Sequence, residues 1–331
     1  MLKMTSSSLV AIAAFAMSVT NPVSANAQEA YPSRPITAVV PFSAGGPTDG
    51  LARIVAQGLT EKLGQQVLVE NVPGAGGTIG SGRTARAEPD GYTLLVGHAG
   101  TLAANVGLYK KLPYDAVDDF EPIGFMGDVP QILLVRKDLP VQTAAEFITY
   151  AKEHQDELNC GTAGVGSAAH LGGLLLNAAL GTHIELVSYK GAGPAMNDLM
   201  GGQIDCMVDV TTTAVPQIKA DTVRPLAVLR TQRIDVVPEV PTTAEVGLNN
   251  MEANIWNVLL APKGTPQPVL DRLTTALHET MEDPAVRERL AKLGVEPPSE
   301  TQVTPVEIKA FIQADIDRWL PIIKTAGASA D

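Results

Sequence analysis

Short apolar, β-branched runs alternate along the chain with segments in which apolar residues recur every three or four positions. Residues 36–40 form such a run and stop at Pro41, so we expect a buried strand there. The apolar spacing from Leu51 to Leu63, closed by Gly64, predicts a helix. This order places the free backbone N–H groups of a helix start above the carboxyl end of a strand, an arrangement that binds anions.

The same arrangement recurs about 120 residues further on. A short strand through Cys160 leads into the glycine-rich segment 161–170, which is followed by an apolar helix over 171–180 and by Gly181. Two glycine-rich, hydroxyl-bearing helix starts indicate two lobes that grip one anion between them. The alternative is that each loop is an ordinary βα turn of a doubly wound sheet.

The remaining pattern predicts further strands and helices in an α/β order. Predicted strands cover 67–70, 92–96, 132–138, 184–187, 204–208, 225–229 and 256–263. Residues 78–87 read as a short helix, Thr143 to Glu146 as a capping box that starts a helix, and Thr242 to Glu245 as a second capping box.

The two similar strands 132–138 and 256–263 bracket about 120 residues, which is typical of paired crossings between two lobes. We therefore expect a discontinuous first lobe, residues 28–130 and 255–331, with a second lobe, residues 131–254, inserted into it. Each lobe is expected to hold a mainly parallel sheet flanked by helices, with the ligand cleft between the lobes.

Residues 1–27 have the pattern of a secretory signal peptide. Lys3 precedes an 11-residue apolar run, and a small-x-small cleavage site ends at Ala27. That run is too short to span a bilayer, which takes about 20 apolar residues. Cleavage would leave 304 residues with a net charge of −13 and no basic cluster, which argues against nucleic acid and anionic membranes as partners.

The chain has two cysteines, Cys160 and Cys206, each beside a predicted strand. We expect two buried, reduced thiols. A disulfide is the alternative in an oxidising compartment, provided that the two Cα atoms lie within about 7 Å.

The common catalytic and metal-binding motifs are absent. The five histidines form no i, i+4 pair and neither cysteine belongs to a C-x-x-C motif, so we expect no metal. G-x-S-x-G, the P-loop and a complete G-x-G-x-x-G are also missing, and we expect no cofactor. The acidic segment 108–122 is expected to be a solvated loop.

What remains is a set of hydrogen-bond donors without catalytic chemistry. A helix start stabilises an anion by about 0.3–1 kcal/mol, up to about 2 kcal/mol when partly buried. A hydrogen bond to a charged group adds about 1.5–3 kcal/mol, whereas micromolar affinity takes about 8 kcal/mol. Desolvation and ordering costs are subtracted from these gains. We therefore expect one loop to bind too weakly and two loops that close on the same carboxylate to reach this affinity.

Several segments match one family in order along the whole of residues 31–220. These are 31–36, 41–49, 70–77, 89–95, 111–115, 164–171, 189–191 and 216–220. Together they resemble the substrate-binding proteins of tripartite tricarboxylate transporters, the Bordetella uptake gene (Bug) family. The resemblance implies a monomeric, type II-like periplasmic binding protein that is not an enzyme. It also implies delivery of a small carboxylate, aliphatic or aromatic, to a large and a small membrane subunit.

The resemblance also implies which residues hold the ligand, through backbone and hydroxyl donors and bridging waters. The first set is Phe42, Ser43, Ala44, Gly45, Gly46, Thr48 and Asp49. The second set is Thr162, Ala163, Gly164, Gly166, Ser167 and His170. Asp209 resembles a cleft-lining aspartate of the family, and its alternative role is to cap the following helix.

The segments 97–100 and 210–213 fall where the family varies, so the distal end of the ligand stays open. His98 either donates a hydrogen bond to a second carboxylate of the ligand or bonds only to its own loop. Two other functions are weighed against transport. One is a ligand sensor for a signalling system, and the other is an exported carboxylate-processing enzyme with His170 or Asp209 as its base.

Overall fold

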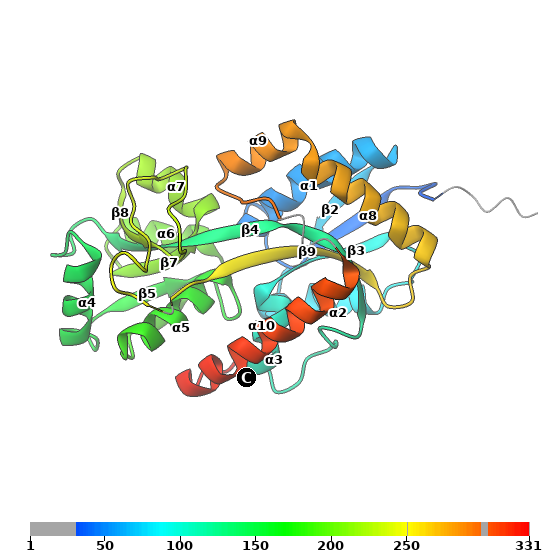
Figure 1. Cartoon of the computed structure of the whole chain (residues 1–331). Coiled ribbons are helices and arrows are strands. Elements are labelled where there is room, and N and C mark those ends of the chain that lie inside the picture. Colours follow the sequence, from blue (N-terminus) through cyan, green and yellow to red (C-terminus); the bar gives the residue numbers. More distant parts are fainter. Residues whose placement is uncertain (1–30, 250, 299–303, 331) are drawn as a thin grey trace, which may run out of the picture. The chain divides into compact units, whose positions relative to one another are not determined.

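The computed structural model describes residues 31–249, 251–298 and 304–330 (Figure 1). The predicted signal peptide, residues 1–27, lies outside these ranges. Within the described residues, no helix combines the length and the apolar character needed to cross a bilayer.

The first part of the chain builds three parallel strands joined by helices. They are β1 (Ile36–Val40), α1 (Pro47–Leu63), β2 (Val67–Asn71), η1 (Ala75–Gly77), α2 (Thr78–Ala85) and β3 (Thr93–His98). β1 lies between β2 and β3. The predicted strand over 36–40 and the helix that ends before Gly64 are confirmed.

Two long antiparallel strands connect this sheet to a second one. β9 (Asn254–Pro262) pairs with β3 and with β4 (Phe120–Arg136). β4 pairs with β9 as far as Pro130 and with β7 from Gln131 onward. One strand therefore belongs to both sheets, and Figure 1 shows β4 and β9 running side by side from one sheet to the other.

The second sheet repeats the parallel arrangement. Its elements are α4 (Ala144–Glu153), β5 (Asn159–Thr162), α5 (Ala168–Leu180), β6 (Glu185–Ser188), α6 (Ala192–Met200), β7 (Cys206–Val210), α7 (Thr211–Lys219) and β8 (Val223–Val228). β5 pairs in parallel with β6 and β7, while β4 runs antiparallel to β7 and β8. Each sheet is thus a parallel unit completed by antiparallel strands.

The last helices pack back onto the first sheet. They are α8 (Gln267–Glu282), α9 (Pro284–Lys292) and α10 (Pro305–Ala326), and the short η2 (Gly100–Ala104) and α3 (Asn105–Leu108) follow β3. Trp256 of β9 packs edge-on against Phe311 of α10 at 5.4 Å between ring centroids, and its indole N–H donates to Asp315 at 2.8 Å. This contact fixes α10 against the two shared strands.

Three elements differ from the sequence-based expectation. β4 begins 12 residues before the predicted strand at 132, because register shifts near Pro122 and Phe125 let a proline- and glycine-rich segment continue the ladder. The box at Thr242 and Glu245 forms both of its hydrogen bonds but closes a turn rather than a helix. Helix α9 was not predicted.

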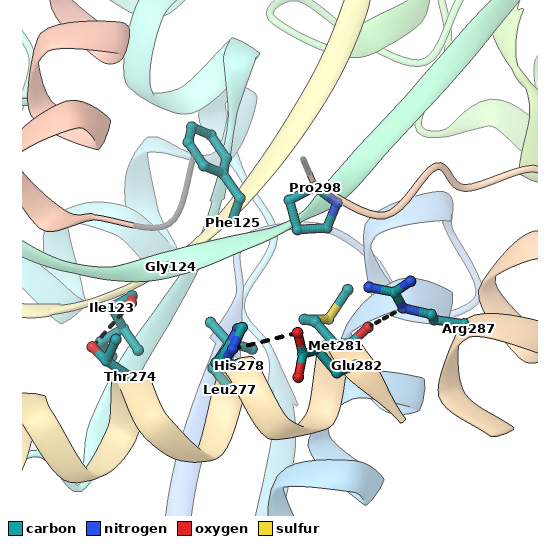
Figure 2. Close-up of a pocket in the computed structure, with 10 residues that line it drawn as sticks. All are labelled: Ile123, Gly124, Phe125, Thr274, Leu277, His278, Met281, Glu282, Arg287 and Pro298. Carbon is teal, nitrogen blue, oxygen red and sulfur yellow. Dashed lines mark hydrogen bonds and ion pairs between the residues drawn. The ribbon is translucent and has the colours of Figure 1, made fainter. Parts of the chain in front are cut away.

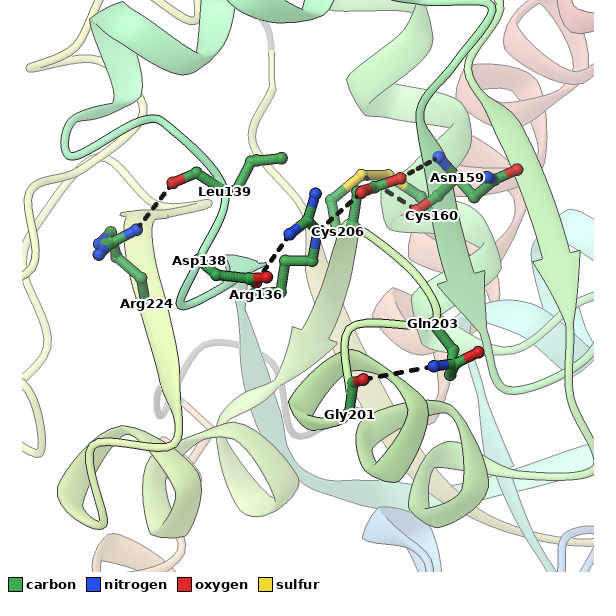
Figure 3. A network of polar contacts seen from close by, with 10 residues as sticks. Arg136, Asp138, Leu139, Asn159, Cys160, Gly201, Gln203, Cys206 and Arg224 are labelled. Atoms are coloured by element: carbon green, nitrogen blue, oxygen red, sulfur yellow. Dashed lines mark hydrogen bonds and ion pairs between the residues drawn. A yellow bond between two sulfur atoms is a disulfide. The ribbon is translucent and has the colours of Figure 1, made fainter.

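The expectation of two reduced thiols is wrong, because Cys160 and Cys206 form a disulfide. They are register partners on the neighbouring parallel strands β5 and β7, which places their Cα atoms 4.4 Å apart. Figure 3 shows the bond beside Asn159 and Arg136. The carboxylate of Asp205, next to Cys206 in the chain, accepts from the Arg136 guanidinium at 2.8 Å and from the Asn159 N–H at 2.9 Å. The two cysteines pair because their strands are neighbours in the sheet, and the apolar pattern of the sequence does not reveal this strand order.

We predict that loss of this disulfide lowers the free energy of unfolding by about 2–4 kcal/mol, since it closes a long loop in the unfolded chain. Urea unfolding with and without dithiothreitol measures the change. The Cys160→Ala/Cys206→Ala double variant serves as a control, because its stability should not respond to the reductant. Two titratable thiols in the untreated, unfolded protein would contradict the assignment.

Candidate ligand-binding site

The first glycine loop ends in a helix start without a side-chain cap. Gly46 is the extended N-cap residue of α1, and no side chain caps this helix. Gly45 has a φ of +79°, which glycine adopts without strain. The loop residues Ser43 to Gly45 are exposed, whereas Thr48 and Asp49, which carry the first backbone N–H groups of the helix after Pro47, are buried.

Asp49 holds this loop in shape. Its buried carboxylate accepts hydrogen bonds from the Gly45 N–H, the Arg53 guanidinium and the Asn71 amide, each at 2.9 Å. Burial works to raise the pKa of Asp49, and these hydrogen bonds together outweigh it and lower the pKa. The predicted site residue Asp49 therefore lies at the loop with its carboxylate committed to the protein.

The second glycine loop has a different construction. Gly164 and Gly166 both have positive φ, and the Ser167 hydroxyl caps α5 by accepting from the His170 N–H at 3.2 Å. The His170 ring accepts at Nδ1 from the Gly166 N–H at 3.3 Å, and burial lowers the pKa of His170 to about 4. His170 is therefore neutral near pH 7 and serves the loop rather than supplying a charge.

Thr162 lies at the base of the second loop, at the end of β5. Its hydroxyl donates to the Val187 carbonyl at 3.4 Å and its carbonyl accepts from the Tyr189 N–H at 3.0 Å. These bonds tie the loop to the β6 side of its sheet. Ala163, the next predicted site residue, is partly buried.

The second loop approaches the segments that follow β2 and β3. A side chain at Gly76 would meet the Val165 carbonyl at 2.8 Å, and one at Gly166 would meet the Asn105 amide oxygen at 2.5 Å. A side chain at Gly100 would overlap the Gly166 carbonyl. Residues from both sheets thus converge here, and the close approach depends on glycine on both sides.

His98 ends β3 at this convergence. Its ring stacks on Phe42 at 4.5 Å between centroids, and its Nδ1 accepts from the Gly100 N–H at 2.6 Å. Burial lowers the pKa of His98 to about 4, so the ring is neutral near pH 7 and its proton resides on Nε2. The bond to its own loop is thus present and uses one of the two ring nitrogens, while a bond to a second carboxylate of the ligand stays a prediction.

Asp209 ends β7 and is buried. Its carboxylate accepts from the Val210 N–H at 2.9 Å and from the Thr213 hydroxyl. Val210 is the N-cap residue of α7, so Asp209 binds the start of the next helix, as the capping alternative predicts. Burial raises the pKa of Asp209 to about 6.

Sequence reasoning missed three buried amide side chains near the two loops. Asn105, Gln131 and Asn257 each donate from the amide nitrogen to a backbone carbonyl, of Gly76, Ala168 and Ile255 respectively. In each of the three the amide oxygen is buried without a hydrogen-bond partner. Their signal in the sequence is a lone amide in an apolar run, as in Trp256-Asn257-Val258.

A pocket elsewhere on the first sheet does not involve these loops. Figure 2 shows it between α8 and the first part of β4, lined among others by Phe125, Leu277, His278 and Arg287. Among residues 31–249, 251–298 and 304–330, no group of three or more His, Cys, Asp or Glu side chains is arranged to hold a metal ion.

Comparison with known proteins decides the family. Residues 51–328 match the TctC family, described as tripartite tricarboxylate transporter family receptors. The chain belongs to this family. Its members are binding proteins of the periplasm, not enzymes.

Three solved structures of similar proteins have the same fold. The periplasmic binding protein BugD is 42% identical, with a TM-score of 0.84 over 90% of this chain and 99% of BugD. MatC from Rhodopseudomonas palustris, solved with bound malate, is 40% identical, with a TM-score of 0.83 over 88% and 100% of the two chains. Rpa4515 from R. palustris, solved with adipate, is 35% identical, with a TM-score of 0.85 over 90% and 99%. The present chain therefore has the two-lobed α/β fold of periplasmic binding proteins.

The raised pKa of Asp209 predicts a pH-dependent stability. Because its folded pKa of about 6 lies above its unfolded value, protonated Asp209 favours the folded state below about pH 4, and this contribution is lost as the pH rises through 6. Asp209→Asn removes this dependence, so the variant should gain about 2–3 kcal/mol relative to the wild type between pH 4 and pH 7.

Urea unfolding of both proteins at the two pH values measures the gain, and the comparison cancels the titration of all other groups. Asparagine keeps an oxygen acceptor for the Val210 N–H, so the loop is conserved in the variant. Parallel pH profiles of the two proteins would contradict the assignment.

Proposed function

We propose that this protein is exported, loses its signal peptide near Ala27 and acts in the periplasm as a monomeric solute-binding protein. It captures a small organic carboxylate, dicarboxylate, tricarboxylate or aromatic carboxylate between its two glycine loops. It then delivers the ligand to the large and small membrane subunits of a tripartite tricarboxylate-type transporter. The observation that carries the proposal is the approach of the second glycine loop to the segments that follow β2 and β3, where His98 stacks on Phe42 of the first glycine loop.

The chemistry of the two loops favours a carboxylate. The first turns of α1 and α5 present backbone N–H groups, and Ser43 and Ser167 add hydroxyl groups. The protein is acidic, with a net charge of −12, so its overall field repels an anion and the binding energy has to come from local donors.

Three basic side chains at the loops supply no free positive charge. Arg53, one turn into α1, donates to Asp49 and to the Asn71 side chain. His98 and His170 are neutral because burial lowers the pKa of each. Neutral, oriented donors of the two loops therefore supply the recognition.

We place one lobe boundary between residues 130 and 131 and the other between residues 254 and 255. The first lobe then comprises residues 28–130 and 255–331 and the second residues 131–254. The change of partner along β4, from β9 to β7 between Pro130 and Gln131, supports this division. Bending at these two strands would change the distance between the loops while each sheet stays intact.

Isothermal titration calorimetry with a panel of carboxylates, at pH 7.5, tests the proposal. At least one member should bind with a dissociation constant in the micromolar range or below, and it should raise the melting temperature of the protein. The corresponding amides lack the charge and should not bind. A panel without binders, or equal binding of acids and amides, would contradict the proposal.

A glycine pair tests the requirement for loop approach. Gly166→Ala should weaken binding by roughly 10-fold or more, because the added methyl group would meet the Asn105 amide oxygen. Gly181→Ala is the matched control, since Gly181 ends the same helix with a similar positive φ and its added methyl group would meet nothing within 4 Å. Both variants carry a similar backbone penalty. Equal affinities of the two variants would argue against approach of the second loop to Asn105.

A further inference from the structure

His98 and Asn257 lie directly opposite each other on the antiparallel strands β3 and β9. Opposed residues of an antiparallel pair point to the same face of the sheet, with their Cβ atoms about 5 Å apart. Both side chains are buried, with exposed fractions of 3% for His98 and 1% for Asn257. Two polar groups side by side in a buried place need an explanation, because buried polar atoms are normally hydrogen-bonded.

The His98 ring is fixed as a donor. Its Nδ1 accepts from the Gly100 N–H, so the proton of the neutral ring is on Nε2, and stacking on Phe42 fixes the ring plane. Two backbone N–H groups, of Gly100 and Thr101, donate to Nδ1. The Nε2–H group therefore points in a fixed direction.

The Asn257 amide is fixed as an acceptor. Its nitrogen donates to the Ile255 carbonyl at 3.0 Å, which sets the orientation of the amide. Its oxygen is buried and has no partner among the described residues. A ring N–H donor and an amide oxygen without a partner thus stand on neighbouring strands.

This pair belongs to the place where the two loops meet. A side chain at Gly100 would overlap both the His98 ring at Cε1 and the Gly166 carbonyl of the second loop. The Cε1 atom lies next to Nε2 in the ring, so the donor edge of His98 is close to the second loop. Asn105, also with an unpartnered oxygen, contacts the same loop at Gly166.

We propose, on the basis of the function proposed above, that His98 and Asn257 form a subsite for a hydroxyl group, so that the ligand is a hydroxycarboxylate. The ligand hydroxyl accepts from His98 Nε2–H and donates to Asn257 Oδ1. A carboxylate oxygen has no hydrogen for Asn257, an ammonium group has no acceptor for His98, and a methylene group satisfies neither. A hydroxyl group satisfies both with one atom.

The family itself leaves this choice open. MatC was solved with malate, which carries a hydroxyl group, and Rpa4515 with adipate, which carries none. The inference therefore rests on the side chains of this chain. A water molecule also has a donor and an acceptor, and the test below distinguishes it from a ligand hydroxyl.

Calorimetry with pairs that differ only in the hydroxyl group tests the subsite. The pairs are malate (both enantiomers) with succinate, lactate with propionate, and citrate with propane-1,2,3-tricarboxylate. In the pair that binds, the hydroxy acid should bind roughly 10-fold more tightly or better. Equal affinities within every binding pair would show that only water occupies the subsite and would overturn this inference alone. Absence of binding by every acid would overturn the proposed function and this inference with it.

Asn257→Leu removes the acceptor and keeps a similar side-chain size. The hydroxyl preference is the ratio of the affinity for the hydroxy acid to that for the matched acid without the hydroxyl group. In this variant the ratio should fall toward 1, because the affinity for the hydroxy acid falls while that for the matched acid stays the same. Asn197→Leu, an exposed asparagine on α6 outside the loops, is the control and should keep the wild-type preference. An unchanged preference in Asn257→Leu would overturn the role of Asn257, and if this variant does not fold, the wild-type preference decides.

Discussion

The antiparallel pairing of β4 with β9, and the change of partner along β4, is the constraint on which the rest of the structure depends. β4 joins the first sheet through β9 and the second sheet through β7 and β8. Parallel strands that end at the same edge place their following loops together. Because β4 is shared, the segments that follow β2 and β3 in one sheet and the loop that follows β5 in the other are brought to the same place, next to Phe42 of the loop after β1.

The electrostatics of the site follow from burial more than from charge. Asp49 is ionised but saturated by donors of the protein, and His98 and His170 are buried and neutral. Charges in this region therefore shape the loops, while backbone N–H groups, hydroxyl groups and amides remain to bind a ligand. Donors held in place by a folded backbone lose little freedom on binding, which keeps the cost of binding low.

Much of the fold was predictable because the spacing of apolar residues distinguishes strands from helices in this chain, and glycine or proline marks their ends. The helix start at Gly46 and the cap at Ser167 follow from local chemistry that the sequence contains. The disulfide and the full length of β4 were not predictable. Cys160 and Cys206 meet only because β5 and β7 are neighbours, and β4 passes through a segment whose glycines and prolines resemble a loop.

The candidate site was also predictable only in part. Both loops were found from their residues, whereas the partners of their side chains depend on tertiary structure. The Asp49 carboxylate, on α1, is bonded within the protein in part because the Asn71 side chain, on β2, donates to it. The role of Asn105, Gln131 and Asn257 could not be identified, because an amide oxygen without a partner is recognised only when its surroundings are known.

A crystal structure of the protein with a bound carboxylate tests the central claim most directly. The account predicts that the carboxylate lies within hydrogen-bond distance, about 3 Å, of the backbone N–H groups or hydroxyl groups of both glycine loops, directly or through one water molecule. A carboxylate bound in the pocket beside α8, or one held mainly by an arginine side chain, would contradict it.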